Sequence, residues 1–522
     1  MSEPSTTNAG KRSSLALLLT TSVVSSLIML DSNVVAVSLP AIGRSLHAGF
    51  TDVQWVISAY VVTYAALLLA AGNFADLYGR KKATVIGLVI FGLASAACGL
   101  ANSSLLLNVS RAIQGIGGAL LLTSSLAILS HAFIGAARQH ALAFWGASLG
   151  IALAAGPIIG GAITDFFGWR WVFLVNLPIC VVLVVSTFRV IEESHDPDAR
   201  SLDWAGIATF SLALAVMIWA LIDGNDAGWT SQTIAVRLVV AAILFAAFAV
   251  AELRQKHPMV DFGLFRHRTF LGGVLAMIGY GASAQVMVFF LPVFLQNAYG
   301  FSPFAAGVAM IPFAMPMVLA LKFVPPLASR YSGRILLSAG LATTLVGNVL
   351  FWYVASAGRS YAYFVVSMVI AGIGAGLLNG QTVKVLQGAV PEERAGMASG
   401  IASTTRFIGI LVAVAALGAV LGNVARDAFS AAAIAFGLGP EAAATGAKGV
   451  ISGDLEGVVR TVPNAIRTQI HDAGLHAYAH GFAAATVIAA AVAAIAAVVT
   501  FLTVSERETA PSANQAQQLV GD

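Results

Sequence analysis

The sequence predicts an all-α polytopic membrane protein with fourteen transmembrane helices. Of its 522 residues, 58% are hydrophobic and only 10% are charged, whereas soluble globular proteins carry about 25% charged residues. Apolar stretches long enough to cross a bilayer recur from Leu15 almost to the C-terminus. The net charge of +4 resides mainly in the loops between these stretches, which indicates membrane orientation rather than nucleic-acid binding.

Each transmembrane helix needs about 20 mostly apolar residues. Fourteen segments qualify, and their even number places both termini on one side of the membrane. The first is longer than the apolar region of a signal peptide and lacks a small-residue cleavage pattern, so we expect it to be retained. The segments are Leu15–Leu39, Val53–Ala71, Thr84–Leu100, Leu105–Leu129, Ala141–Ile163, Trp171–Phe188, Trp204–Ile222, Ile234–Ala251, Phe270–Leu295, Phe304–Val324, Ile335–Tyr353, Tyr361–Leu386, Met397–Leu421 and Phe482–Val504.

The basic residues predict the orientation of these segments. When the loops are assigned alternately to two sides, eighteen of the 28 Lys and Arg residues fall on the side of the N-terminus. The short loops of the opposite side hold only Arg44, Arg170, Arg237 and Arg359. Because cytoplasmic loops retain Lys and Arg, we expect a multi-pass protein of the bacterial cytoplasmic (inner) membrane, surrounded by lipid, with both termini in the cytoplasm.

A weak internal repeat divides the chain into two bundles of six helices. Segment 115–121 resembles segment 372–378, and the loop at 75–81 resembles the one at 328–334 at nearly the same offset. The bundles would span residues 1–190 and 268–505, with residues 203–252 forming an inserted transmembrane hairpin. Repeated bundles of this kind are typical of secondary transporters, which place the substrate at the bundle interface.

The longest predicted loop, residues 422–481, would lie outside the cell. It is rich in Ala and Gly and contains His471, His476 and His480. These histidines suit a metal ion, but no carboxylate or cysteine stands at ligand spacing beside them. We therefore expect solvated histidines, with no metal and no other cofactor.

Asp31 lies past the middle of the first predicted helix, with apolar residues on both sides. Burial disfavours the charged form of a carboxylate, so Asp31 can be neutral in one conformation and ionised in another. Such a change would couple proton movement to substrate movement. The alternative is that Asp31 pairs with an arginine of a neighbouring helix or caps an irregular helix.

A polar face follows in the fourth predicted helix, where Asn108, Arg111 and Gln114 are spaced three residues apart. An intramembrane arginine normally faces the interior of a bundle, so Arg111 would hold a carboxylate or respond to its protonation. A static structural pair is the alternative. Arg406, in the thirteenth helix, stands nearer the cytoplasmic end, which favours extension of its side chain toward the membrane surface.

The loop after the second predicted helix combines Gly72, Asp76, Gly79, Arg80 and Lys81. The glycines permit a tight turn, and Asp76 can sit at a helix N-terminus or pair with an arginine across the bundle interface. We expect this loop to act as a conformational latch. A plain charged turn is the alternative.

The fifth predicted helix is rich in small residues that permit close helix packing and carries a proline that removes a backbone hydrogen bond. The pattern favours a bendable interface, although ordinary close packing explains it as well. Its residues are Gly146, Gly150, Gly156, Pro157, Gly160 and Gly161.

Three of these motifs together resemble the major facilitator superfamily, in particular its fourteen-span drug:proton antiporter branch. The stretch 72–81 is similar to the superfamily's loop motif, segment 111–115 to its motif in the fourth helix, and Gly156-Pro157 with Gly160-Gly161 to the antiporter motif in the fifth. Segments 30–35, 168–178 and 289–303 are further similarities to this branch.

The resemblance implies a secondary transporter that exports small lipophilic or cationic compounds, such as drugs, dyes or biocides, in exchange for protons by alternating access. Asp31 and Arg111 would couple protons, the Gly156-Pro157 segment would restrict leak, and the transport path would present Asn33, Asn108, Gln114 and Arg406. Phe74, Leu77, Asn33 and Ala36 depart from the usual residues of the family motifs. The tenth and thirteenth helices carry no acidic residue, which favours monovalent or neutral lipophilic substrates.

Two other functions remain open at this point. A dedicated exporter of one metabolite, siderophore or self-made antibiotic would use the same fold, because specificity depends on pocket shape. A non-transporting sensor or membrane enzyme would need an effector domain or catalytic groups. The sequence shows no phosphate-binding loop and no catalytic triad spacing, so we expect neither ATP hydrolysis nor another enzymatic activity.

Overall fold

The computed structural model describes residues 8–195, 203–255, 260–391 and 394–509, and every element in these ranges is helical. Fourteen helices within them are long and apolar enough to cross a membrane, as the sequence predicted. Residues 196–202 and 256–259, on either side of the predicted hairpin, lie outside the described residues.

The first group of helices, here called the first bundle, extends to Val190. Helices α1 and α5 pack side by side, and α4 packs between α2 and α3. The sixth predicted span consists of two helices, α6 and α7, joined at Val175. The bounds are α1 Asn8–Leu46, α2 Phe50–Tyr78, α3 Arg80–Gly99, α4 Ser104–Ala132, α5 Gly135–Phe166, α6 Arg170–Leu174 and α7 Asn176–Val190.

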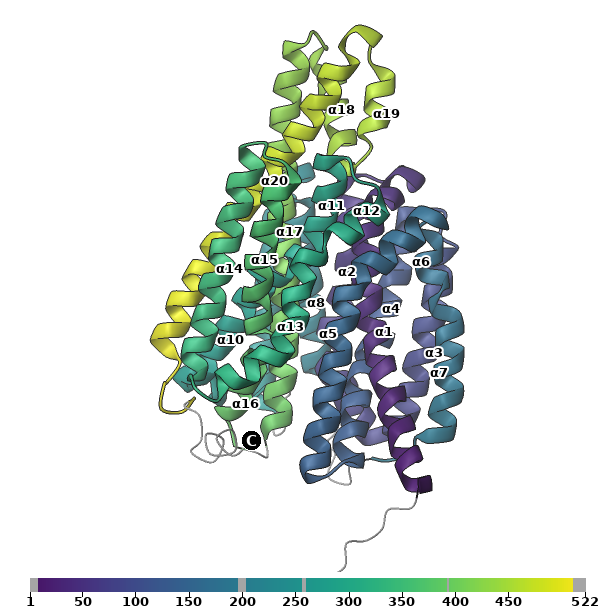
Figure 1. Ribbon diagram of the computed structural model, residues 1–522, viewed down its shortest axis with the longest axis vertical. Coiled ribbons are helices and arrows are strands. Elements are labelled where there is room, and N and C mark those ends of the chain that lie inside the picture. Colours follow the sequence, from purple (N-terminus) through teal and green to yellow (C-terminus); the bar gives the residue numbers. More distant parts are fainter. Residues whose placement is uncertain (1–7, 196–202, 256–259, 392–393, 510–522) are drawn as a thin grey trace, which may run out of the picture.

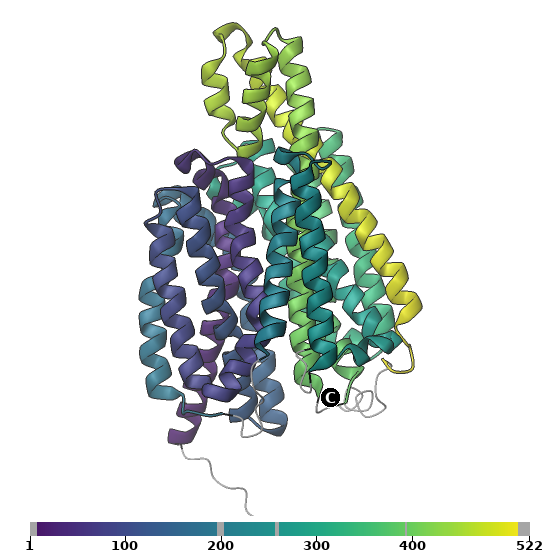
Figure 2. The same ribbon diagram turned by 180° about the vertical axis from the view of Figure 1, so that it is seen from behind.

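Helices α8 (Trp204–Ala227) and α9 (Gln232–Arg254) pack against each other as a hairpin. Helix α8 contacts both α2 of the first bundle and α17 (Ala395–Ala435) of the remainder of the chain. The hairpin therefore lies along one flank of the seam between the two halves of the molecule (Figure 2).

The second bundle is more interrupted than the first. A π-helical turn at Gly281–Gln285 separates α10 from α11, and Gly380, at a φ of 85°, separates α15 from α16. The bounds are η1 Phe262–Arg266, α10 Arg268–Tyr280, η2 Gly281–Gln285, α11 Met287–Tyr299, α12 Pro303–Ala309, α13 Ile311–Ala328, α14 Gly333–Ser356, α15 Tyr361–Leu378, α16 Gln381–Gly388, α17 Ala395–Ala435 and α20 Arg467–Thr503.

Most of the predicted loop 422–481 is helical. Helix α17 continues to Ala435 and α20 begins at Arg467, and between them lie α18 (Pro440–Ser452), α19 (Leu455–Thr461) and η4 (Asn464–Ile466). Alanine is the strongest helix former, which explains why an Ala-rich segment extends these helices. Phe429, Val450 and Ile470 lie in a separate apolar core. We call residues 422–481 the cap (Figure 1).

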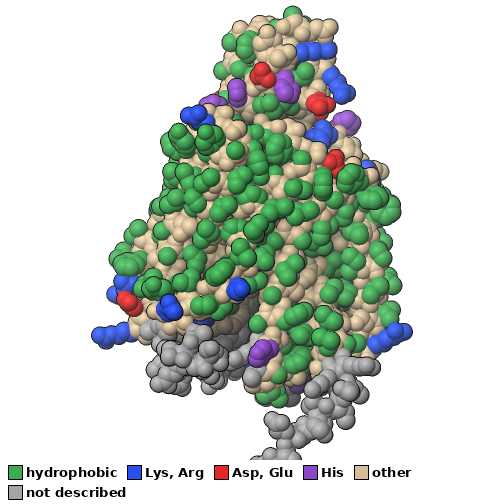
Figure 3. All heavy atoms as spheres, viewed as in Figure 1, with side chains coloured by type: hydrophobic (Ala, Val, Ile, Leu, Met, Phe, Trp, Pro, Cys, Tyr) green, Lys and Arg blue, Asp and Glu red, His purple; other side chains and the backbone are tan. Residues whose placement is uncertain are grey.

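The cap defines one end of the molecule, the cap face. Helix α1 begins and α20 ends at the opposite end, the terminal face (Figure 1). On the face seen in Figure 3, hydrophobic side chains dominate the surface between the two ends, whereas the charged side chains gather near the ends. This distribution is the one expected of a protein that a lipid bilayer surrounds.

Candidate functional site

Asp31 and Arg111 form an ion pair inside the first bundle. Nη1 of Arg111 donates a hydrogen bond to Oδ2 of Asp31 at 2.6 Å, and both side chains are at most 1% exposed. The residues come from α1 and α4, whose facing polar positions the sequence analysis identified separately. The structure thus brings together the two residues that the sequence analysis proposed for proton coupling. The ion pair itself is the alternative that the sequence analysis gave for Asp31, namely a pair with an arginine of a neighbouring helix.

Amide groups complete the surroundings of the Asp31 carboxylate. Its Oδ1 accepts hydrogen bonds from Nε2 of Gln114 at 3.0 Å and from Nδ2 of Asn176 at 2.8 Å. Both amides also donate to Oγ of Ser95, at 2.9 and 3.0 Å. Each carboxylate oxygen therefore has at least one donor, which is the condition under which a buried ion pair can be retained.

Arg111 is held by its other contacts as well. Its Nε donates to the carbonyl oxygen of Val56 at 3.1 Å, and its guanidinium lies 4.2 Å from the ring centroid of Tyr60. Nη1 also donates to Oε1 of Gln114 at 2.7 Å. Five helices, α1, α2, α3, α4 and α7, thus surround one buried charge pair.

Sequence reasoning missed three members of this site. Ser95, Asn176 and Tyr60 are buried on α3, α7 and α2. Each is a polar residue in the middle of an apolar segment, and that signal was present in the sequence. Nothing local in the sequence indicates that the three segments converge on Asp31, because their contacts are separated by dozens of residues.

Asn33 and Asn108 lie apart from the ion pair. Nδ2 of Asn33 donates to the carbonyl oxygen of Met29 one turn earlier in α1, and Nδ2 of Asn108 donates to the carbonyl oxygen of Asp52 at 3.3 Å. Both side chains therefore bind backbone oxygens in this conformation.

Arg406 lies eleven residues inside α17, roughly 16 Å along the helix axis. Its side chain is half-buried, and the adjacent ring of Phe407 packs edge-on against Tyr64 of the first bundle at a centroid distance of 4.6 Å. Arg406 thus stands at the seam between the bundles.

The loop after α2 makes its contacts within the first bundle. Asp76, in the last turn of α2, accepts two hydrogen bonds from Arg80 at 2.8 and 3.0 Å. Gly79 has a φ of 112°, and Gly72 faces the side chain of Thr123. The backbone N–H of Lys81 donates to the carboxylate of Glu193 at 3.1 Å, which caps the start of α3. In this conformation Asp76 pairs with a residue of its own bundle.

The glycines of α5 divide into two sets. Gly156 and Gly160 press against α1: a Cβ at these positions would lie 2.6 Å from Cβ of Asn33 and 2.7 Å from Cα of Val34. Gly161 lies against the backbone of Pro303, and Pro157 lies against Gly307. Gly146 would meet no atom within 4 Å, and Gly150 would meet only Leu321 at 3.6 Å.

The two sets of glycines show at which end of the molecule the two bundles pack tightly against each other. In the cap-face halves, Oγ of Ser302 donates to Asp165 at 2.7 Å, and Nε2 of Gln296 donates to the carbonyl oxygen of Val37 at 2.8 Å. Toward the terminal face, α5 and α13 separate, and a hollow is visible between the bundles (Figure 3). Helices α2 and α17 stay in contact on the other flank, where Leu69 faces Gly400.

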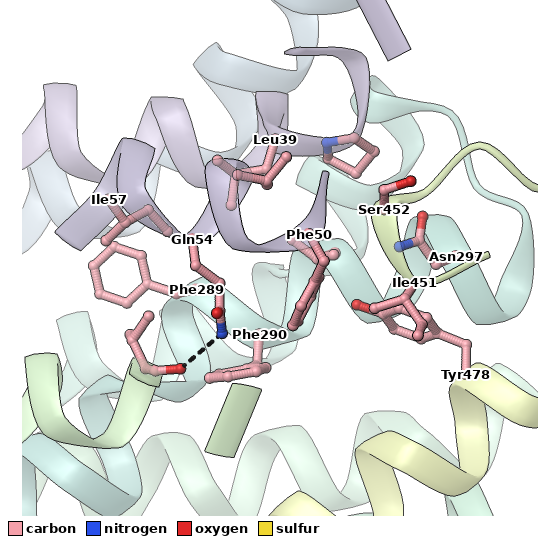
Figure 4. A pocket seen from close by; sticks show the side chains of 14 residues that line it. Leu39, Phe50, Gln54, Ile57, Phe289, Phe290, Asn297, Ile451, Ser452 and Tyr478 are labelled. Atoms are coloured by element: carbon pink, nitrogen blue, oxygen red, sulfur yellow. Dashed lines mark hydrogen bonds between the residues drawn. The ribbon is translucent and has the colours of Figure 1, made fainter. Parts of the chain in front are cut away.

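A small apolar pocket of about 50 Å³ lies at the cap-face end of the seam (Figure 4). Side chains of both bundles and of the cap surround it, and Gln54 bridges it by donating to the carbonyl oxygen of Val414 at 3.4 Å. The lining residues are Leu39, Pro40, Phe50, Val53, Gln54, Ile57, Phe289, Phe290, Val293, Asn297, Val414, Ile451, Ser452 and Tyr478.

In the cap, Nδ1 of His471 lies 3.4 Å from a carboxylate oxygen of Asp472. Across the described ranges, no group of three or more His, Cys, Asp or Glu side chains is arranged to hold a metal ion.

Comparison with known proteins places these features in a family. The chain is 36% identical over 411 residues to the multidrug resistance protein Stp of Mycobacterium tuberculosis (strain CDC 1551 / Oshkosh), covering 78% of this chain and 76% of Stp. It is 31% identical over 497 residues to the multidrug efflux pump LfrA of Mycolicibacterium smegmatis (strain ATCC 700084 / mc(2)155), covering 95% and 97%.

The fold is shared with a solved structure of a bacterial homologue of the human lysosomal transporter Spinster in an inward-facing and occupied conformation. The TM-score is 0.62 at 17% identity, covering 95% of this chain and 98% of that one. Residues 21–414 match the family model of the Major Facilitator Superfamily. The resemblance seen in the sequence motifs is thereby confirmed, and this chain belongs to the Major Facilitator Superfamily of membrane transporters.

Proposed function

We propose that this protein exports small lipophilic compounds across the bacterial cytoplasmic membrane in exchange for protons, by alternating access of two bundles. The observation that carries the proposal is the fully buried Asp31–Arg111 pair, with every carboxylate oxygen hydrogen-bonded. The names of the relatives, a multidrug resistance protein and a multidrug efflux pump, support export of drug-like compounds.

The ion pair suits proton coupling because protonation of Asp31 removes the counter-charge of Arg111. An uncompensated buried charge costs about 3–5 kcal/mol, enough to change which of two conformations a protein prefers. In the conformation described, the pair is formed and the carboxylate is shielded. Proton binding would require rearrangement of the donors from Gln114 and Asn176, which links the proton to a movement of helices.

We further propose that the terminal face is cytoplasmic. The excess of basic residues in loops on this side supports that orientation. The conformation described would then admit substrate from the cytoplasm between α5 and α13, and its cap face would be closed. The apolar pocket at the cap end of the seam supports lipophilic cargo, since its polar side chains are few.

Two motifs receive roles within this proposal. Gly156, Gly160 and Gly161 would let α5 approach α1 and α12 closely enough to prevent leak at the cap face. The loop from Gly72 to Lys81 would act as a latch when the terminal face closes. In that step Asp76 would have to exchange its contact with Arg80 for one across the seam.

The proposal is tested with purified protein in liposomes that carry a lipophilic dye and an imposed pH gradient. We expect uphill dye movement that stops with an uncoupler, and release of protons when dye is added. Asp31→Asn should abolish uphill movement. Asp223→Asn is the matched control, because Asp223 pairs with Arg237 in the hairpin, remote from Asp31 in the sequence and on a different helix.

Dye movement that is insensitive to the uncoupler would reject proton exchange. Uphill movement by Asp31→Asn equal to that of the unmodified protein would reject the role of Asp31.

A further inference from the structure

The seam between the bundles contains a cluster of hydrogen-bond donors without acceptors. Its members are Arg406 on α17, Tyr64 on α2 and Tyr280 at the end of α10. Tyr64 and Tyr280 are 0% and 1% exposed, yet neither hydroxyl has a hydrogen-bond partner within the described residues. Nε of Arg406 also lacks a partner there.

Contacts between helices bring these three residues near one another. The guanidinium of Arg406 lies 4.9 Å from the ring centroid of Phe407. Gly281, next to Tyr280, is so close to α17 that its Cβ position lies 2.5 Å from the carbonyl oxygen of Arg406. The ring of Phe407 joins the cluster through its edge-on contact with Tyr64. The cluster thus contains residues of both bundles.

Arg406 also differs from the other intramembrane arginine. Arg111 has a carboxylate, two further oxygen acceptors and a fully buried setting. Among the described residues, no carboxylate lies within ion-pair distance of Arg406, and its closest ring contact is its own neighbour Phe407. Arginine offers five donors and no acceptor, so this half-buried cation can bind an additional anion.

Aromatic rings pack beside the cluster of Arg406, Tyr64 and Tyr280. Tyr60 stacks on Tyr64 at a centroid distance of 5.8 Å and an interplanar angle of 13°, and Tyr60 in turn lies beneath Arg111. Aromatic rings next to a cation and two hydroxyl donors match a ligand with an aromatic body and one anionic oxygen group.

We propose that Arg406, Tyr64 and Tyr280 bind the acidic group of a flat lipophilic substrate, such as a carboxylate, a sulfonate or a phenolate. The identification of this ligand as transported cargo rests on the proposed function. The inference narrows the substrate class: a cationic compound would be repelled by Arg406, and no carboxylate of the cluster offsets that repulsion.

The test uses three naphthalene probes of nearly equal size, namely 2-naphthoate, its methyl ester and 2-(aminomethyl)naphthalene in its cationic form. Binding to the full-length protein in nanodiscs of zwitterionic lipid is measured by calorimetry, without a proton gradient. We expect 2-naphthoate to bind at least about 10-fold more tightly than the ester, because hydrogen bonds to a charged group contribute most to affinity. The cation should bind most weakly.

Variants assign the effect to the cluster. Arg406→Gln should weaken naphthoate binding about 10-fold or more and leave ester binding unchanged, whereas Arg406→Lys should retain part of the preference. Tyr64→Phe and Tyr280→Phe should each weaken naphthoate binding several-fold. Arg359→Gln is the matched control, because Arg359 is exposed at the cap-face end of α14 and should leave all three affinities unchanged. Thermal unfolding of each variant verifies folding.

The possible outcomes separate this inference from the proposed function. Equal affinity for acid and ester, or unchanged naphthoate binding by Arg406→Gln, would overturn the inference. So would competition by chloride alone, with no preference among the organic probes, since the site would then hold an inorganic anion only. Tight naphthoate binding without proton-driven transport would overturn the proposed function but support the anion site. Proton-driven export of cations alone would support the proposed function but overturn the anion site.

Discussion

Gly161 of α5 and Pro303 of α12 touch through their backbones: a Cβ on Gly161 would lie 2.3 Å from the carbonyl oxygen of Pro303. No side chain larger than hydrogen fits between them. Because α5 belongs to the first bundle and α12 to the second, this contact closes the cap-face end of the seam. The neighbouring contact between Gly307 and the carbonyl oxygen of Pro157, 2.2 Å from the Cβ position, repeats the arrangement.

Gly161→Val is therefore expected to hold the bundles apart at the cap face and to favour the opposite conformation. Spin labels at Phe167 and Ala357, both exposed at that face, should report a longer distance by pulsed electron resonance. Gly146→Val is the control, because its Cβ would meet no atom within 4 Å. Equal distances in both variants and in the unmodified protein would show that closure does not depend on this contact.

Removal of one member of the central ion pair should destabilise the protein more than removal of both. Asp31→Asn leaves the Arg111 charge buried without a counter-ion, and we expect a loss of about 3–5 kcal/mol in the free energy of unfolding. The double variant Asp31→Asn, Arg111→Gln should recover part of this loss. The free energy of unfolding of each variant is measured in detergent by circular dichroism.

The control for this pair is Asp223→Asn, whose partner Arg237 is partly exposed. Its loss should stay within about 1 kcal/mol. A double variant as unstable as the sum of its single variants would contradict a direct interaction between Asp31 and Arg111.

Gly79→Ala should destabilise the turn between α2 and α3. Gly79 has a φ of 112°, which disfavours a side chain, and its Cβ position lies 2.5 Å from a carboxylate oxygen of Glu193. We expect a cost of about 1–3 kcal/mol, measured as a lower unfolding temperature. Gly388→Ala, at the end of α16, should be neutral or slightly stabilising, since its Cβ position is open. Equal effects of the two substitutions would argue against strain at Gly79.

Arg44→Ala should loosen the contact between the cap and the first bundle. Nη1 of Arg44 donates to the carbonyl oxygen of Gly453, at the turn between α18 and α19, at 2.9 Å. Loss of one such bond, worth about 1 kcal/mol, should raise amide hydrogen exchange in residues 440–461 about 5-fold. Arg460→Ala serves as the comparison, because Arg460 is exposed and its pairing with Glu456 is long. Unchanged exchange in Arg44→Ala would show that the cap is held by other contacts.

The helical structure of the cap could not be predicted from the sequence. The sequence analysis predicts residues 422–481 as a loop, because this segment lies between the last two predicted spans. Their high alanine content instead extends α17 and α20, and apolar residues such as Phe429 and Ile470 lie in a separate core. A helix outside the membrane needs only a narrow apolar stripe, and a search for 20-residue apolar stretches does not detect one.

The cluster of Arg406, Tyr64 and Tyr280 could not be predicted from the sequence for a different reason. Arg406 was recognised as an intramembrane arginine, but a location near the membrane surface was favoured over one between the bundles. Tyr64 and Tyr280 carried no signal, because aromatic residues are common in apolar helices. Their encounter depends on how α2, α10 and α17 pack, and no short motif encodes that packing.

The sequence by itself determined the membrane setting, the fourteen spans and the candidate pair Asp31 and Arg111. These follow from hydropathy over about 20 residues and from the cost of ionisable groups in lipid, both of which are local properties. Only the tertiary structure decided that Asn176 and Ser95 complete the pair, that Gly161 meets Pro303, and that Phe407, next to Arg406, packs against Tyr64. Such contacts join segments far apart in the chain, and they are set by the packing of whole helices.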